Sequence, residues 1–434
     1  MNPQHTSRSP QALVDHFFRH AYGQLLAALV RRFGAAHLQL AEDAVQAALL
    51  AALHTWASHD EIPENPTAWL QRVAHNHLLD QLRNQRRRDA LNERWLPPAD
   101  PSATEIPETT LTSEVNDDLL RMLFACCDPQ LSARMQLVLA LKLLCGFSVR
   151  EIAQRLFISP ANVEKTLTRG RSRLKAAWGQ ACAQPLQAAG EQLKPRLQSV
   201  RYVIYLLFNE GYSSQRDDQP IATDLCLEGL RLATLLASHL VSADSETYAL
   251  CALLCFHSAR LKARLHGPGP VVTLAQQDRS LWDYQLIAQG MDYLLRSGRD
   301  GRFTRFHAEA GVMAIHCSAP NYSATRWSEI VDLYEMLEQR EPSPLHSLNR
   351  IIAIAEWRGP KAGLEALAAF TPPPWLADYY LWAATRGELL RRDSQFELAL
   401  PLLQQAQKRA PNRAEGQLLQ TRVEHCLNRD PTPF

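Results

Sequence analysis

Apolar residues recur every three to four positions along almost the whole chain. Leu and Ala dominate these positions, and the alternating Val, Ile and Thr pattern of β-strands is rare. Four blocks follow one another: a helical block at 11–95, a polar segment at 96–118, a helical block at 119–180 and a longer helical region at 186–434. The pattern predicts an all-α protein with two small helical domains and a larger third one.

The segment 96–118 differs from its neighbours in composition. It holds four prolines, six acidic residues and no basic residue. Such a segment has too little apolar surface to fold by itself, so we expect a flexible acidic linker between the two small domains.

The clearest local motif lies at Ser148–Lys175. Ser148 followed by Glu151 forms a capping box, in which each side chain pairs with the backbone N–H of the other residue. Ser159 can cap a second helix whose first position is Pro160. The inner faces of the two helices are expected to be Val149, Ile152, Ala153 and Leu156, and Val163, Leu167, Gly170 and Leu174. With about three residues between them, the helices predict a helix-turn-helix, whose second helix enters the major groove of DNA.

Charge within this motif agrees with DNA binding. It contains seven basic and two acidic residues, a net charge of +5, although the whole chain carries only +1. Residues near the start of the second helix are candidates for base edges and the later arginines for phosphates. The predicted DNA-binding residues here are Ser159, Asn162, Lys165, Thr166, Arg169, Arg171 and Arg173. A helical hairpin with a solvated basic face is the alternative.

Two further segments narrow the class of DNA-binding protein. AEDAVQAALLAALHTW (Ala41–Trp56) and PTAWLQRVAHNHLLDQLRNQRRR (Pro66–Arg88) resemble the second conserved region of RNA polymerase sigma factors of the extracytoplasmic-function class. Leu139–Lys175 resembles their fourth region. The resemblance implies a protein that binds core RNA polymerase and promoter DNA and directs transcription initiation, rather than an enzyme.

The resemblance also implies roles for residues of the first block. Glu42, Asp43 and Gln46 would bind the polymerase, above a buried face of Val45, Ala48, Leu49 and Ala52. An acidic residue near a helix start is also simple compensation of the helix dipole. The residues left for the −10 promoter element are His75, Asn76, Asp80, Arg83, Arg86 and Arg87. Family members commonly carry Arg where this chain has His75 and His77. This difference predicts weaker binding of the DNA phosphates or a preference for a different promoter sequence.

The region after residue 186 is unusual for a minimal sigma factor. Ala383, Gly387, Leu390, Ala399, Leu403, Ala406 and Pro411 match the spacing of a tetratricopeptide unit, and a degenerate unit precedes it at 347–370. RLQSVRYVIYLLFNEGYSSQ (Arg196–Gln215) and LAQQDRSLWD (Leu274–Asp283) resemble segments of a sigma-factor subgroup with a fused tetratricopeptide-like domain. We expect tetratricopeptide-like structure at 346–413 and regulation in cis by this extension.

Two other functions fit parts of the sequence. A free-standing helix-turn-helix regulator with a tetratricopeptide sensor would have no use for Ala41–Arg88. An enzyme could use Glu210, Asp278 and either His307 or His316, although their spacing matches no recognised acid–base or metal motif. Capping and salt bridging explain these residues as well. The sequence predicts no cofactor and no metal site.

Cysteines and the N-terminus bear on the compartment. Neither Cys126–Cys127 nor the pair Cys251 and Cys255 has flanking ligands that would complete a zinc site, so we expect buried reduced thiols. The first ten residues lack the layout of a secretory signal, and no apolar run is long enough to span a bilayer. A cytoplasmic protein without membrane association is expected.

Overall fold

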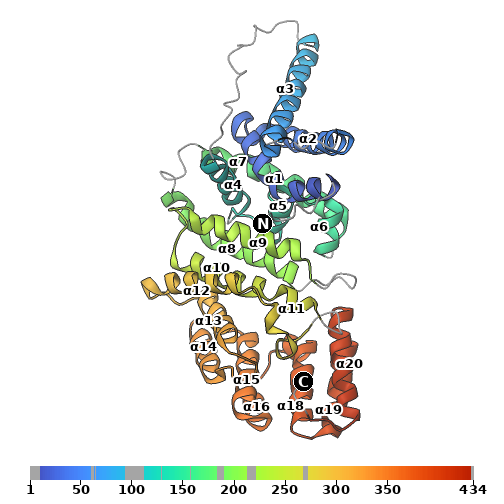
Figure 1. Ribbon diagram of the computed structural model, residues 1–434, viewed down its shortest axis with the longest axis vertical. Helices are drawn as coiled ribbons and strands as arrows, with labels where there is room; N and C mark the ends of the chain where they lie inside the picture. Colours follow the sequence, from blue (N-terminus) through green and yellow to red (C-terminus); the bar gives the residue numbers. More distant parts are fainter. Residues whose placement is uncertain are drawn as a thin grey trace, which may run out of the picture. The chain divides into compact units, whose positions relative to one another are not determined.

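The computed structural model describes residues 10–59, 63, 65–92, 112–128, 130–156, 158–182, 190–212, 221–266 and 272–431. These residues form helices joined by turns, and none of them lies in a strand. The chain divides into two compact units, Met1–Val203 and Ile204–Phe434 (Figure 1). The all-α prediction, with small helical domains followed by a larger one, is confirmed.

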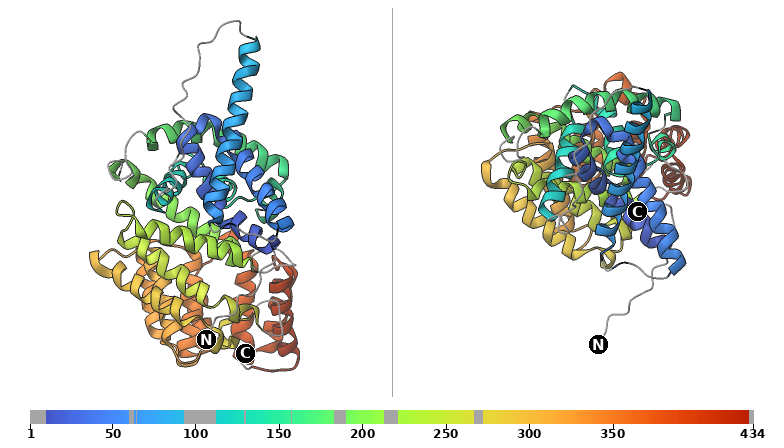
Figure 2. Two further views of the ribbon diagram at one scale, coloured as in Figure 1. Left: turned by 45° about the horizontal axis from the view of Figure 1, so that its top comes forward. Right: turned by 90° about the horizontal axis from the view of Figure 1, so that it is seen from above.

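Unit 1 begins with three helices around a common core. These are α1 (Pro10–Phe33), α2 (Leu38–His59) and α3 (Pro66–Asn92), with the short η1 (Ala35–His37) between the first two. α1 contacts both α2 and α3, and α2 contacts α3. The predicted inner face of α2 is confirmed, because Val45, Ala48, Leu49 and Ala52 are all buried. The far end of α3 extends beyond α1 and α2 (Figures 1 and 2).

Four more helices complete most of unit 1: α4 (Thr112–Cys126), α5 (Ala133–Leu143), α6 (Val149–Arg155) and α7 (Pro160–Cys182). α4, α5 and α6 all contact α7. The crossing of α5 and α7 is close, since a Cβ at Gly170 would lie 2.9 Å from the side chain of Leu139. Only a residue without a side chain fits at that point.

The segment expected to be an acidic linker falls partly outside the described residues, which leave out 93–111. Its last residues belong to α4, where Asp118 is buried and accepts a hydrogen bond from Arg31 Nη1 of α1 at 3.0 Å. An acidic side chain can be buried there because a guanidinium pairs with it.

α8 (Gly190–Tyr212) contributes to both units, because the division between them falls within this helix. In unit 1, Leu197 and Val200 are buried and Arg196 pairs with Asp128 at 3.3 Å. In unit 2, Ile204, Leu207 and Phe208 are fully buried.

Unit 2 continues with α9 (Thr223–Ser238), α10 (Ser245–Ala259), α11 (Leu261–Leu265), α12 (Tyr284–Ser297) and α13 (Arg305–Ser318), and with the short helices η3 (Leu274–Gln276), η4 (Arg279–Leu281) and η5 (Gly298–Asp300). α10 lies at the centre and contacts α9, α12 and α13. Its residues from Ala249 to Phe256 are all fully buried. A helix that is apolar on every side requires such a position.

The rest of unit 2 consists of consecutive packed helices: α14 (Trp327–Arg340), α15 (Pro344–Arg358), α16 (Pro360–Ala369), α17 (Pro374–Ala377), α18 (Tyr380–Arg392), α19 (Phe396–Lys408) and α20 (Arg413–Leu427). α18 packs on α19 and α19 on α20 (Figure 1). A Cβ at Gly387 of α18 would lie 2.9 Å from Leu403 of α19, and Ala399 and Ala406 are fully buried. Small residues therefore allow the close crossing that the tetratricopeptide spacing predicts.

Cys126, Cys127, Cys251 and Cys255 are free and buried, as expected. Burial raises the pKa of the Cys255 thiol to about 12, so the thiol stays protonated near neutral pH. No helix among the described residues is long and apolar enough to cross a membrane.

Candidate polymerase and nucleic-acid interface

The helix-turn-helix forms as its caps predict. Ser148 N–H donates to Glu151 Oε2 at 2.8 Å, and Glu151 N–H donates to Ser148 Oγ at 3.2 Å. Ser159 Oγ accepts from the N–H of Asn162 at 3.3 Å at the start of α7. The inner face of α7 is buried, with Val163, Leu167, Gly170 and Leu174 packed inward.

The outer face of α7 presents most of the predicted DNA-binding side chains. Ser159, Asn162, Lys165, Arg169 and Arg173 are exposed. Thr166 is half-buried and its hydroxyl donates to the carbonyl oxygen of Asn162 at 2.7 Å, within the helix. Exposed cations and amides on one side of a capped helix are suited to contacts with phosphates and base edges.

Arg171 does not share this open position. Its Nη2 donates to Glu42 Oε2 of α2 at 2.7 Å. Glu42 is only 3% exposed, and its other carboxylate oxygen lies 4.0 Å from Lys142 Nζ of α5. The structure therefore joins a predicted polymerase-binding residue to a predicted phosphate-binding residue. Asp43 and Gln46, the other predicted polymerase-binding residues, are exposed.

Burial governs the electrostatics of this contact. Removal from water raises the pKa of Glu42, and the charges of Arg171 and Lys142 oppose that rise. Burial likewise lowers the pKa of Lys142, against the attraction of Glu42. Sequence reasoning missed Lys142. It is the one charged residue in the apolar run from Leu137 to Phe147, and such an isolated lysine could have been recognised as a buried partner.

Glycines allow the α1–α3 bundle and the helix-turn-helix bundle to pack closely against each other. A Cβ at Gly23 of α1 would collide with the carbonyl oxygen of Leu144, directly after α5. Gly146 adopts a φ of +71°, and a Cβ there would lie 2.9 Å from the ring of Tyr22. The positive φ and the aromatic ring both favour glycine at this position.

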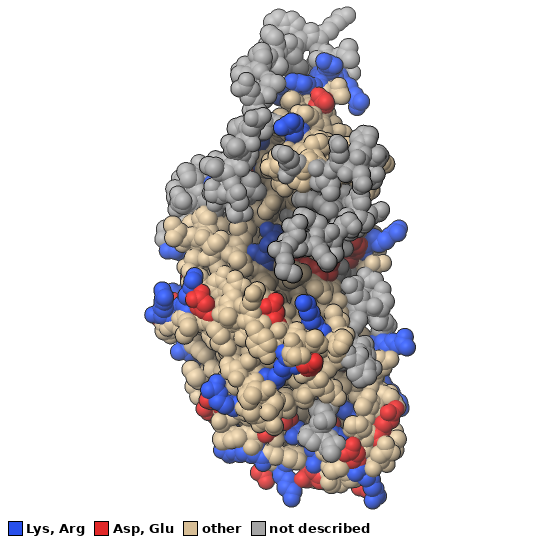
Figure 3. All heavy atoms as spheres, in the orientation of Figure 1, with Lys and Arg blue, Asp and Glu red and all other residues tan. Residues whose placement is uncertain are grey.

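The predicted −10 residues on α3 divide into one buried and several exposed side chains. His75 is 6% exposed and its ring centroid lies 5.2 Å from that of Phe33. Burial and the nearby charge of Arg32 lower its pKa, so the imidazole is neutral near pH 7. Asn76, Asp80, Arg83, Arg86 and Arg87 are exposed, and Arg83 lies 3.7 Å from Asp80. Lys and Arg side chains gather toward the far end of α3 (Figure 3).

Known proteins match these same segments. Residues 18–88 match the family model "Sigma-70 region 2", and residues 121–174 match "Sigma-70, region 4". The two matches cover the α1–α3 bundle and the helix-turn-helix bundle, in that order. This chain belongs to the sigma factors of the extracytoplasmic-function class. It directs promoter recognition in transcription, and it carries a C-terminal extension.

Two further comparisons concern the sigma factor as a whole. Residues 196–298 match a family of unknown function, DUF6596. An uncharacterized protein of Rhizobium meliloti (strain 1021) is 35% identical over 414 residues, which cover 95% of each chain. No solved structure matches the chain.

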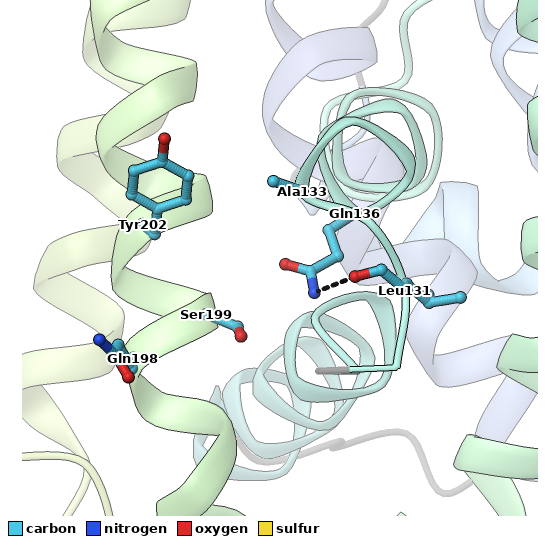
Figure 4. A pocket seen from close by; sticks show the side chains of 6 residues that line it. All are labelled: Leu131, Ala133, Gln136, Gln198, Ser199 and Tyr202. Carbon is cyan, nitrogen blue, oxygen red and sulfur yellow. Dashed lines mark hydrogen bonds between the residues drawn. The ribbon is translucent and has the colours of Figure 1, made fainter.

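Region 4 also borders a shallow pocket of about 280 Å³. Leu131, Ala133 and Gln136 line it on one side, and Gln198, Ser199 and Tyr202 of α8 on the other (Figure 4). Gln136 Nε2 donates to the carbonyl oxygen of Leu131 at 3.1 Å. None of the predicted site residues lines this pocket.

Three residues of the enzyme alternative, Asp278, His307 and His316, have separate structural partners. Asp278 is a cap, since its Oδ1 accepts from Ser280 N–H at 2.9 Å. His307 closes a capping box with Thr304 and lies 3.0 Å from Ser245 Oγ. His316 packs edge-on to Trp327, with 5.1 Å between ring centroids. The described residues contain no group of His, Cys, Asp and Glu that could hold a metal ion. The sigma regions point to a role as a transcription factor.

Proposed function

We propose that this sigma factor binds core RNA polymerase through Glu42, Asp43 and Gln46 on α2 and reads two promoter elements. In this proposal the exposed side of α3 holds the −10 element and the outer face of α7 holds the −35 element. The observation that carries it is the presence of both sigma regions in one chain, each with exposed basic side chains on its candidate DNA face.

The domain assignments of this proposal follow the sequence. Region 2 would occupy 11–95, the linker 96–118, region 4 119–180 and the extension 186–434, with tetratricopeptide-like structure at 346–413. The protein would act in the cytoplasm, where core polymerase and promoter DNA are found.

The burial of Glu42 gives the proposal a conformational step. While Arg171 and Lys142 cover its carboxylate, Glu42 has almost no surface to offer to the polymerase. Regions 2 and 4 would therefore separate before Glu42 binds. The same separation would free Arg171 for a phosphate.

We also infer that the extension regulates the sigma regions in cis through α8. The first half of α8 packs in unit 1, and the second half belongs to the core of unit 2. Arg196 Nη1 donates to the carbonyl oxygen of Phe124 at 3.3 Å and thereby fixes α8 to α4 of region 4. A change in unit 2 that moved α8 would therefore also move the residues of α8 that contact region 4.

Promoter-directed transcription tests the first proposal. Purified full-length protein, core polymerase and pooled genomic DNA are combined, and the transcripts are sequenced. We expect new transcript starts that depend on the protein, preceded by two shared sequence elements. If the protein binds duplex DNA by itself but produces no new starts, the polymerase-binding role fails.

A point variant tests regulation in cis. Arg196→Ala in the full-length chain removes the contacts with Phe124 and Asp128, and we expect a changed yield of the same transcripts. Gln198→Ala, at an exposed neighbour on α8, is the matched control. Deletion of 204–434 should change the yield in the same direction. Unchanged yields in both would exclude cis regulation while leaving the sigma activity intact.

A further inference from the structure

Most of the described arginines of unit 2 that are half-buried or buried have a carboxylate partner. The pairs are Arg231 with Glu228 at 2.6 Å, Arg305 with Glu309 at 2.6 Å, Arg350 with Glu338 at 3.0 Å, Arg391 with Glu388 at 2.8 Å and Arg392 with Glu356 at 2.5 Å. Pairing is the expected condition, because a buried charge without a partner is costly.

Arg260, at the end of α10, departs from this pattern. It is only 5% exposed. Its Nε donates to the amide oxygen of Gln277 at 3.0 Å, and its Nη1 donates to Met313 Sδ at 3.6 Å. Both acceptors are neutral and the second is weak. Within the described part of the chain, no carboxylate lies at ion-pair distance from this guanidinium.

Arg279, in η4, is a second such arginine at the same place. Its Nη1 donates to the carbonyl oxygens of His316 at 2.9 Å and Ala319 at 2.6 Å. Its Nη2 is buried with no acceptor among the described residues. Both guanidinium groups lie against the ring of Trp282, with their Cζ atoms 4.4 Å (Arg279) and 5.6 Å (Arg260) from its centroid.

The surroundings of these two arginines contain further unused polar atoms. Trp282 Nε1, His316 Nδ1 and His257 Nδ1 are buried and have no hydrogen-bond partner among the described residues. Burial, together with the charges of Arg260 and Arg279, lowers the pKa of His316 to about 3. Among the described residues, this part of the interior holds two guanidinium charges and several unpaired ring nitrogens, and no ion pair joins either guanidinium to an acidic side chain.

We propose that Arg260 and Arg279 form a binding site for a small oxyanion, a carboxylate or phosphate group, within unit 2. Guanidinium groups donate to such oxygens in a geometry that fits them closely, and the hydrogen bonds are strong because both partners are charged. Trp282 Nε1 supplies a further donor to the same ligand. The site goes beyond the proposed sigma activity, and it gives the extension a chemical signal to which it can respond.

Thermal unfolding of the full-length protein tests this site without any transcription assay. Potassium phosphate and sodium citrate are titrated separately against potassium chloride at equal ionic strength. A ligand that binds only the folded state raises Tm in a saturable way. We expect such a rise with phosphate if the site takes a phosphate group, with citrate if it takes a carboxylate, and not with chloride.

Variants locate the effect. Arg260→Met and Arg279→Gln should each weaken the apparent affinity at least tenfold. Arg350→Gln, which removes a guanidinium paired with Glu338 in the same unit, should leave it unchanged. A rise in Tm that persists in both cluster variants would come from another surface, such as the basic face of α7, and would overturn the proposal. No rise beyond that of chloride would overturn it too.

A measurement on the unmodified protein covers the case in which a variant fails to fold. Phosphorus NMR of inorganic phosphate should show line broadening on addition of the protein, and citrate should reverse it if both anions use one site. Phosphate that stays sharp, together with no citrate-dependent Tm rise, would exclude the oxyanion site.

Discussion

Two clusters of buried charge in this protein differ in how they are balanced. In unit 1, the carboxylate of Glu42 lies between Arg171 and Lys142, which come from two other helices. In unit 2, Arg260 and Arg279 both lie against the ring of Trp282, and neither has a carboxylate partner in the described part of the chain. The first cluster is closed by groups of the chain itself, so it can hold two bundles together. The second is left incomplete, and an anion from outside can complete it.

The contrast connects burial with function. A balanced cluster resists opening, because separation would leave each charge without its partner. An unbalanced cluster gains stability from a ligand of opposite charge. In the proposed function the first cluster opens before the polymerase binds, whereas the second would be completed by its ligand.

The largest effect is expected from Glu42→Ala. The substitution leaves Arg171 of α7 and Lys142 of α5 without their carboxylate and should lower the local opening free energy of α5 and α7 by about 3 kcal/mol. Hydrogen exchange followed by mass spectrometry measures this opening. Arg260→Met in chloride buffer is the comparison, and it should leave α10 equally or better protected. An equal loss in both variants would mean that Arg260 has a stabilising partner within the chain.

Gly23→Ala should have the next largest effect. Alanine favours the α1 helix, but its Cβ would collide with the carbonyl oxygen of Leu144, so the two bundles must move apart at a cost of about 2 kcal/mol. Hydrogen exchange of α1 and α5 should rise, and so should the yield of promoter-dependent transcripts. Gly416→Ala is the control, since its nearest neighbour is Ala410 at 3.8 Å. Tighter protection in Gly23→Ala would contradict the close packing.

A pH effect should reveal the unbalanced cluster. Because the folded pKa of His316 is lowered from 6.5 to about 3, the unfolded chain takes up a proton before the folded one does. This contribution to stability is present above pH 6.5 and is lost as the pH falls toward 3. Between pH 6.5 and pH 5 the loss is about 2 kcal/mol.

Urea unfolding at these two pH values, followed in unit 2, measures the loss. His316→Asn should reduce the difference between them. His425→Asn, at a half-exposed histidine, controls for removal of an imidazole in general. If both variants keep the full difference of the unmodified protein, His316 is not the source of the pH dependence.

The smallest effects concern DNA. Arg169→Ala, at an exposed position of α7, should relax specificity at one base position by about 1–2 kcal/mol. Arg171→Ala should weaken binding on all promoters and flatten its salt dependence by about one counterion. It should also expose Glu42, because the two side chains are paired. Equal losses on every promoter for both variants would show that the face assignment of α7 is wrong.

Much of the fold could be predicted from local patterns. The capping box at Ser148, the cap at Ser159 and the buried faces of α2 and α7 depend on neighbours within a few residues, and these predictions are confirmed. The small residues of α18 and α19 also matched their packing, because the close crossing of two consecutive helices leaves a short-range signal in the sequence.

The candidate site could be predicted less completely from the sequence. Asp43 and Gln46 are exposed as expected, but Glu42 is buried by residues far along the chain. His75 appeared free for DNA by its polarity, yet it packs against Phe33. A helical pattern assigns a residue to a face of its own helix but does not identify what packs on that face.

The sequence by itself determined the helices, the two sigma regions and their order, because capping, periodicity and family motifs are local. Only the tertiary structure decided which charges meet. It joined Glu42 to Arg171 across 129 positions, and it placed Arg260 and Arg279 together with no carboxylate partner among the described residues. Electrostatic energy depends on the distance between charges and on their burial, and neither follows from the order of the residues in the sequence.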